Sequence, residues 1–346
     1  MINYQQDRVR GSLVGGAIGD ALGFPVEFLR TYEIIQKYYG KEGITTMDIV
    51  NNTGKALISD DTQMTLFTAC GLLNAKEHGM NPLSATTTAY LEWLDTQKDV
   101  QNKQQNFCWI ADIPELYEQR APGITCMEAL EQIQSGREPK NDSKGCGGIM
   151  RIAPVALWGL PQGDILVLNK LAADIARMTH KHPLGYISAF VQSHLIYRLA
   201  LDYTPTRETF KRYLNESMAA ANAEYSNYIN ECNILQDLLD KAILLADIDG
   251  QDHMAIEKIG QGWVAEETLA IAVYCTYKYI DDFEKAVIAA VNHAGDSDST
   301  GAVTGNLVGA AVGYDAIPTH FKENLELHGV ILHIADDLWR GHNTPY

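Results

Sequence analysis

The chain contains 346 residues, of which 46% are hydrophobic and 21% charged, a composition typical of a folded globular protein. With 27 Lys and Arg against 44 Asp and Glu, the formal net charge is −17 and no basic run opposes it, so we expect no binding to a nucleic-acid backbone. The six cysteines form no CxxC pair, which argues against a zinc ribbon or a disulfide framework and favours reduced, buried thiols.

From the N-terminus onward, the sequence shows no targeting or membrane signal. The first ten residues are polar and lack the apolar stretch of a signal peptide. The longest run of small apolar residues, 300–314, is too short to span a bilayer. We therefore expect a cytoplasmic protein without membrane contact.

Apolar residues at positions i, i+3, i+4 and i+7 predict amphipathic helices along most of the chain. Only Ile44–Val50 has the character of a short strand, and short breaker sequences separate the helices without forming a long linker. We predict an all-α fold in a single compact domain that spans residues 1–346. The clearest predicted helices are Asp60–Ala75, Pro161–Met178, Leu184–Leu199, Glu231–Ala246, Glu266–Tyr279 and Phe283–Asn292.

Two further helices are predicted where glycine recurs at every fourth residue. One stripe lies near each end of the chain. Each glycine inside a helix costs about 0.5–1 kcal/mol relative to alanine, and close approach of another backbone is the usual compensation. We predict that both helices are central and tightly packed, and packing against each other is one arrangement that would explain the stripes. The glycines are Gly11, Gly15, Gly19 and Gly23, and Gly301, Gly305, Gly309 and Gly313.

An acidic cluster precedes each of two predicted helices: Ser59-Asp60-Asp61-Thr62 and Asp296-Ser297-Asp298-Ser299-Thr300. Asp60 followed by Gln63 also fits a helix N-terminal capping box, which is the alternative interpretation of the first cluster. Capping needs one carboxylate, whereas each cluster has two, and ligand sets made only of oxygen suit Mg²⁺, Mn²⁺ or Ca²⁺ rather than zinc. Together the clusters could hold two cations roughly 3.5–4 Å apart. Nearby His293 is interpreted as a hydrogen-bonded core residue.

Between the clusters, the glycine-rich turn Gly145–Gly148 precedes a predicted helix at Ile149–Trp158. Free backbone amides at such a turn could receive a phosphate, although neither a GxGxxG nor a P-loop pattern is present. His180 follows Thr179 at the end of another helix, where a histidine most often interacts with the helix C-terminus.

These motifs occur in the order found in the ADP-ribosylglycohydrolase family, which the chain resembles over residues 8–318, and the bacterial members related to the dinitrogenase reductase-activating glycohydrolase are the most similar. The resemblance implies an all-α domain with a dinuclear metal cleft. It also implies an ADP-ribosylated protein as substrate and ADP-ribose as product. The segments that carry it are Gly15–Gly23, Ser59–Thr62, Gly145–Arg151, Thr179-His180, Gly262–Glu267 and Gly295–Ser299.

By position in the family motifs, the resemblance implies three groups of site residues. Two Mg²⁺ or Mn²⁺ ions would be bound by Ser59, Asp60, Asp61, Asp296, Asp298 and Ser299. Gly145, Cys146, Gly147 and Gly148 would hold the diphosphate, and His180 would lie along the ADP-ribose. Glu27, Asp61 and Asp298 would take part in catalysis. Family members usually carry Thr where Ser59 and Ser299 stand, which keeps the hydroxyl, and Asn where Cys146 stands, which removes one polar contact.

The resemblance therefore implies hydrolysis of the C1″ glycosidic bond between ADP-ribose and a protein side chain, most simply arginine. Metal ions can orient the ribose hydroxyls and lower the pKa of water, and a carboxylate can act as acid or base. Three alternatives remain at this point. They are a catalytically inactive ADP-ribose-binding relative, a hydrolase for serine or another O- or N-linked ADP-ribose, and an unrelated dinuclear phosphohydrolase.

Overall fold

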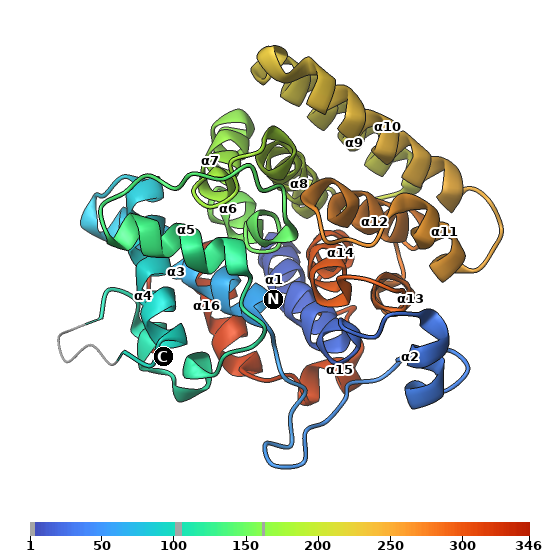
Figure 1. The fold of residues 1–346 in the computed structure, drawn as a ribbon, viewed down its shortest axis with the longest axis horizontal. Coiled ribbons are helices and arrows are strands. Elements are labelled where there is room, and N and C mark those ends of the chain that lie inside the picture. Colours follow the sequence, from blue (N-terminus) through green and yellow to red (C-terminus); the bar gives the residue numbers. More distant parts are fainter. Residues whose placement is uncertain (1–3, 101–105, 161–162) are drawn as a thin grey trace.

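The computed structural model of the chain describes residues 4–100, 106–160 and 163–346, and in these ranges it is helical without a sheet (Figure 1). Five short 3₁₀ turns and three isolated β-bridges accompany the α-helices. The helices are α1 (Tyr4–Gly23), α2 (Tyr32–Tyr39), α3 (Asp60–His78), α4 (Pro82–Gln97), α5 (Ile124–Gln134), α6 (Ala153–Trp158), α7 (Ile165–Arg177), α8 (Pro183–Leu201), α9 (Arg207–Glu224), α10 (Ile229–Ala246), α11 (Asp252–Ile259), α12 (Ala265–Lys278), α13 (Phe283–Val291), α14 (Ser297–Val312), α15 (Thr319–Glu323) and α16 (His328–Arg340). The predicted all-α fold is confirmed.

The two glycine stripes lie on α1 and α14, and these helices pack directly against each other in antiparallel order. A Cβ atom added to Gly19 would lie 1.9 Å from the carbonyl oxygen of Gly301, and one added to Gly11 would lie 2.4 Å from that of Gly309. The backbones therefore approach to a distance that no side chain permits. This contact places the end of α1 beside the beginning of α14, where one of the acidic clusters lies.

The central helices are buried around almost their whole circumference. Nearly every residue of α1, α3, α8 and α14 beyond the first turn is buried, which is why none of the four shows a one-sided apolar stripe. Amphipathic helices such as α7 and α16 cover them, and the α9–α10 hairpin forms one edge of the molecule (Figure 1). In the described residues, no helix is long and apolar enough to cross a membrane.

Most of the predicted helices begin and end within three residues of the observed helices; examples are α3, α8, α10, α12 and α13. The predicted helix Pro161–Met178 is α7, which begins at Ile165; its first two residues lie outside the described ranges. The predicted helix Ile149–Trp158 begins only at Ala153, because residues 149–151 form a turn that continues the preceding 3₁₀ turn and Pro154 lies in the first turn of the helix.

The predicted strand Ile44–Val50 is wrong. Val50 forms only an isolated bridge with Lys55, and no neighbouring strand is available for pairing in the described chain. The backbone of Ile44 is satisfied instead by the side chain of Asn292, whose Oδ1 accepts from the Ile44 amide and whose Nδ2 donates to its carbonyl, each at 2.8 Å. A side-chain amide thus replaces the sheet partner that the alternation predicted.

Candidate active site

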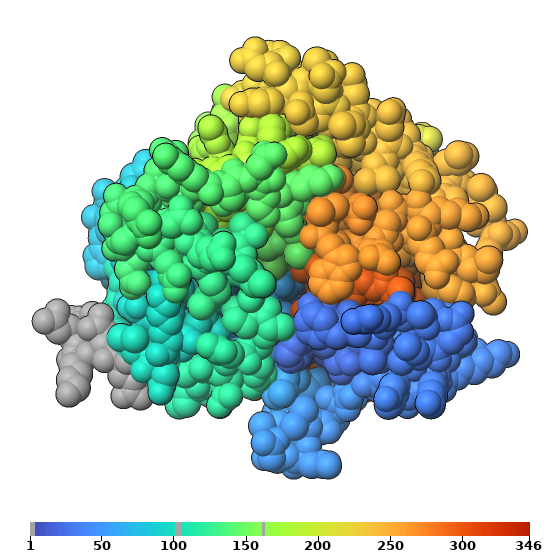
Figure 2. All heavy atoms as spheres, in the orientation of Figure 1, coloured from blue at the N-terminus to red at the C-terminus, as the bar shows by residue number. Residues whose placement is uncertain are grey.

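A cavity of about 520 Å³ opens where Glu27 and Phe28, just after the 3₁₀ turn that follows α1, meet the beginnings of α3, α5 and α14 and the 145–147 turn. Figure 2 shows the face where the N-terminal (blue), 121–147 (green) and 260s (orange) segments surround a hollow. The volume is in the range of small-molecule sites. Ten predicted site residues line it, and Ser59 and Gly148 lie behind the lining; the ten are Glu27, Asp60, Asp61, Gly145, Cys146, Gly147, His180, Asp296, Asp298 and Ser299.

The fold brings the two acidic clusters together at this cavity. Carboxylate oxygens of Glu27, Asp296 and Asp298 lie within 4.8 Å of one another, and all three residues are buried. Burial and the charge of Asp298 raise the pKa of Asp60 and of Asp61 well above the ordinary range, and burial also raises the pKa of Asp298. Such a group of acids is stable in ionised form only beside compensating positive charge.

The acidic residues fit divalent cations in both chemistry and hydrogen bonding. Oδ2 of Asp61 and Oε2 of Glu27 are buried and have no hydrogen-bond partner in the described chain. Every carboxylate and hydroxyl of the cluster offers oxygen, the donor preferred by Mg²⁺, Mn²⁺ and Ca²⁺. Glu27, which sequence reasoning placed in catalysis only, lies close enough to Asp296 and Asp298 to share a cation with them.

Helix capping accounts for part of each cluster, but not in the way the sequence predicted. Ser59, not Asp60, is the N-cap of α3, and its Oγ accepts from the Asp61 amide at 3.2 Å. Asp296 caps α14 by accepting from the Ser299 amide at 3.3 Å. Asp61 is not a cap, and its Oδ2 has no partner in the described chain, whereas Asp298 also accepts from the Ser299 amide through Oδ1, at 2.9 Å. Both carboxylates lie at the positive ends of helices.

The acidic segment before α3 is held by a residue that sequence reasoning missed. Asp20 is fully buried on α1, and both of its oxygens accept from the Ser59 amide at 3.1 Å. It also accepts from the Thr62 amide at 3.1 Å and from the Thr62 hydroxyl. The signal was a lone carboxylate within the glycine stripe, a position where an unpaired acid would be costly.

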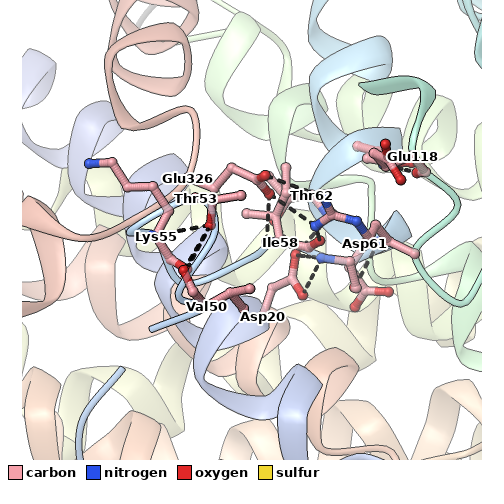
Figure 3. Close-up of polar contacts among 12 residues, drawn as sticks. Asp20, Val50, Thr53, Lys55, Ile58, Asp61, Thr62, Glu118 and Glu326 are labelled. Atoms are coloured by element: carbon pink, nitrogen blue, oxygen red, sulfur yellow. Dashed lines mark hydrogen bonds and ion pairs between the residues drawn. The ribbon is translucent and has the colours of Figure 1, made fainter. Parts of the chain in front are cut away.

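A second clamp acts on the same segment from the C-terminal part of the chain (Figure 3). Oε2 of Glu326 accepts from the Ile58 amide at 3.1 Å and pairs with Arg120 at 3.2 Å. Arg120 also donates to the Ile58 carbonyl at 3.3 Å, and its own carbonyl accepts from the Asp60 amide at 3.0 Å. Residues distant in sequence therefore set where Asp60 and Asp61 point.

The glycine-rich turn encloses the His180 ring. Cβ atoms added to Gly145, Gly147 and Gly148 would lie 3.2, 3.0 and 3.4 Å from atoms of that imidazole. Cys146 is half-buried and directs its Sγ to within 2.7 Å of Oδ2 of Asp296. The turn thus connects the histidine on one side with the acidic cluster on the other.

Aromatic and apolar residues form the mouth of the cavity. Trp263 and Phe28 stack with ring centroids 6.3 Å apart, and Phe28 is 66% exposed. Ile124 lines the opposite segment and is 76% exposed. No sequence motif pointed to Phe28 or Ile124, although Trp263 lies in one of the motif segments. His293, as predicted, is a buried residue hydrogen-bonded to Thr300, at 2.9 Å.

A helical domain with buried carboxylates around a ligand-sized cavity defines a class of enzyme that binds hard cations next to a small molecule. Comparison with known proteins places the chain within this class. The ADP-ribosylglycohydrolase family model matches residues 1–346. The chain therefore belongs to the ADP-ribosylglycohydrolase family, whose members are metal-dependent hydrolases of a glycosidic bond.

Individual relatives agree with this assignment. The chain is 26% identical over 325 residues to the ADP-ribosyl-[dinitrogen reductase] glycohydrolase of Rhodospirillum rubrum. The aligned region covers 93% of this chain and 91% of that protein. It is 24% identical over 224 residues to ADP-ribosylhydrolase ARH3 of Homo sapiens, over 58% and 59% of the two chains. A solved structure described as an ADP-ribosylglycohydrolase-related protein complex matches with a TM-score of 0.68 at 25% identity, over 98% and 99%. The expected family and enzyme class are confirmed.

Proposed function

We propose that the protein releases ADP-ribose from mono-ADP-ribosylated protein side chains by cleaving the C1″ glycosidic bond, with arginine as the preferred acceptor. The observation that carries the proposal is the cluster of buried carboxylates lining a cavity in a chain of this family. The Rhodospirillum rubrum relative is named for an ADP-ribosylated protein, dinitrogen reductase, and its match covers 93% of this chain. This similarity supports a protein substrate. An acidic protein of net charge −17 also favours a cationic guanidinium as the departing group.

Two Mg²⁺ or Mn²⁺ ions would be held by Ser59, Asp60, Asp61, Asp296, Asp298 and Ser299. When bound, such ions supply positive charge that orients ribose hydroxyls and lowers the pKa of water. The burial of these residues beneath the cavity and their oxygen-only chemistry support the assignment. Asp20 and Glu326 then act as positioning residues, because they hold the backbone of the 58–62 segment.

We assign the remaining predicted residues to proton transfer and to binding of the ADP-ribose. Glu27 reaches the same cavity, and its unpartnered Oε2 is the atom at which it would exchange a proton with the departing group. Gly145 and Gly147, with Gly148 behind them, would accommodate the diphosphate next to His180. Cys146 contacts Asp296 and therefore acts on the cation site more directly than on the diphosphate.

Single carboxylate variants test this function. Asp60→Ala or Asp298→Ala should abolish release of ADP-ribose while circular dichroism shows a folded, helical chain. Asp237→Ala removes an exposed carboxylate on α10 and should leave release unchanged. If Asp298→Ala kept full activity in metal-depleted buffer, the proposed mechanism would be wrong.

A panel of substrates identifies the acceptor. Arginine-, serine- and glutamate-linked ADP-ribosyl peptides are incubated with the wild-type protein in Mg²⁺ and in Mn²⁺, and free ADP-ribose is measured. We expect release from the arginine-linked peptide. Release from serine but not from arginine would replace the preferred acceptor, and binding of ADP-ribose without any release would indicate an inactive relative.

A further inference from the structure

Arg151 is fully buried and lies outside the cavity lining, although it belongs to the same motif as the glycine turn. No carboxylate pairs with it in the described residues. Its guanidinium lies 4.5 Å over the ring of Tyr90, and its Nη2 donates to Oγ1 of Thr179 at 2.6 Å. Burying a charge without a counter-ion costs free energy, which indicates that this guanidinium has a specific role.

Thr179 connects Arg151 to the cavity. Its Oγ1 lies 2.8 Å from Nδ1 of His180, whereas its other acceptor, the Ala176 carbonyl, is 3.5 Å away. Arg151 has only donors, so Oγ1 must accept from it, and the hydroxyl hydrogen is free to point elsewhere. Since O–H donors bond best near 2.7–2.8 Å, that hydrogen points to Nδ1.

His180 is thereby left with its proton on the other nitrogen. A neutral imidazole whose Nδ1 accepts a hydrogen bond carries its hydrogen on Nε2. The ring lines the cavity while being only 2% exposed, and Nε2 forms no hydrogen bond within the described part of the chain. Burial and the nearby charge of Arg151 lower the pKa of His180 to about 3, which agrees with a neutral ring.

We propose that Arg151, acting through Thr179, holds His180 as the Nε2–H tautomer, so that it presents a fixed hydrogen-bond donor to an oxygen atom of the bound ligand. This inference rests on the proposed function only for the identity of that ligand, the diphosphate or a hydroxyl of ADP-ribose. Because Nε2–H has no free lone pair, His180 neither binds a cation nor accepts a proton during the reaction. Arg151 and Thr179 are positioning residues in this arrangement.

Nitrogen NMR of the histidine side chain tests the proposal without any ligand. The protein is labelled with ¹⁵N-histidine, and the His180 signals are identified by their absence in His180→Gln. We expect Nε2 to have the shift of a protonated nitrogen and Nδ1 that of an unprotonated nitrogen that accepts a hydrogen bond. The proposal is overturned if Nδ1 carries the hydrogen in the wild-type protein.

Matched variants at position 179 test the role of the hydroxyl. Thr179→Val removes the hydroxyl at nearly constant volume, and Thr179→Ser keeps it. In Thr179→Val we expect the Nδ1 shift to move toward that of a free nitrogen, the Nδ1–H tautomer to appear, and ADP-ribose binding to weaken roughly five- to tenfold. Thr179→Ser should restore both readouts. An unchanged Nδ1 shift in Thr179→Val would contradict the relay.

The two proposals fail separately. If wild-type protein shows the expected tautomer but calorimetry detects no binding of ADP-ribose, the ligand assignment is wrong and the relay stands. If ADP-ribose binds and is released normally while the tautomer is Nδ1–H, the relay is wrong and the proposed function stands. Thermal unfolding of each variant shows whether the fold is retained.

Discussion

Replacement of Gly19 by alanine tests whether the contact between α1 and α14 positions the active site. The added Cβ would lie 1.9 Å from the Gly301 carbonyl oxygen, whereas ordinary contact begins at 3.4 Å. The two backbones must therefore separate by about 1.5 Å at this level. Neither neighbour is a flexible side chain, so the movement has to involve the helices themselves.

Two consequences of this separation can be estimated. Overpacking costs about 1–3 kcal/mol, of which the higher helix propensity of alanine recovers up to about 1 kcal/mol. The movement also shifts the beginning of α14, with Asp296 and Asp298, away from Glu27. A misplacement of about 1 Å at reacting groups can lower the rate about 100-fold. We expect a melting temperature lower by a few degrees and a much larger loss of activity and of Mn²⁺ affinity.

Two other glycines serve as controls. Gly11→Ala creates a similar clash, 2.4 Å from the Gly309 carbonyl oxygen, but eight residues and about 12 Å farther from the site along α1. It should destabilise the protein while retaining Mn²⁺ affinity measured by calorimetry. Gly250→Ala has no heavy atom within 4 Å and should be neutral. If Gly19→Ala unfolds and binds Mn²⁺ like the wild type, the proposed positioning role is refuted.

Three further predictions concern the acidic site. Asp20→Asn replaces an acceptor facing the Ser59 and Thr62 amides by a group that is half donor, so cation affinity should fall about tenfold and the free energy of unfolding by about 1–3 kcal/mol. In EDTA, the free energy of unfolding should be highest near pH 4 and fall as the pH rises toward 7. Burial raises the pKa of Asp20 to about 7 and the pKa of Asp60 above its ordinary range. The unfolded chain therefore releases these protons at lower pH than the folded chain, which favours unfolding as the pH rises. Alkylation of Cys146, the one cysteine of the six that is not buried, should block ADP-ribose release, but only slowly near neutral pH, because burial and the charge of Asp296 raise the pKa of its thiol well above the ordinary value.

Each of these has its own control and its contrary result. Asp237→Asn, on the exposed surface, should leave cation binding intact; equal effects of both asparagine variants would exclude a positional role for Asp20. Thermal unfolding across pH should become flat when Mg²⁺ is added, and a trend that persists in saturating Mg²⁺ would contradict the assigned cause. Cys146→Ser should resist alkylation, so inhibition of that variant would place the reactive thiol elsewhere.

Local sequence patterns were sufficient for most of the secondary structure, because helical periodicity and capping depend on residues within a few positions of each other. They failed where a distant residue decided the outcome. Asn292 replaced a sheet partner at Ile44, and the path of residues 149–152 before α6 follows from the turn packed around His180. In both places the determining contact lies far away in the sequence.

The candidate site was predictable in its residue types and not in its geometry. Paired carboxylates beside helix starts, together with hydroxyls, are enough to predict a hard cation as the partner. Which of them would share one cation depends on the antiparallel contact of α1 and α14, which brings Glu27 beside Asp296 and Asp298. Only the tertiary structure could show that Asp20 and Glu326 hold the segment before α3, since hydrogen bonds between remote elements leave no pattern in a single sequence.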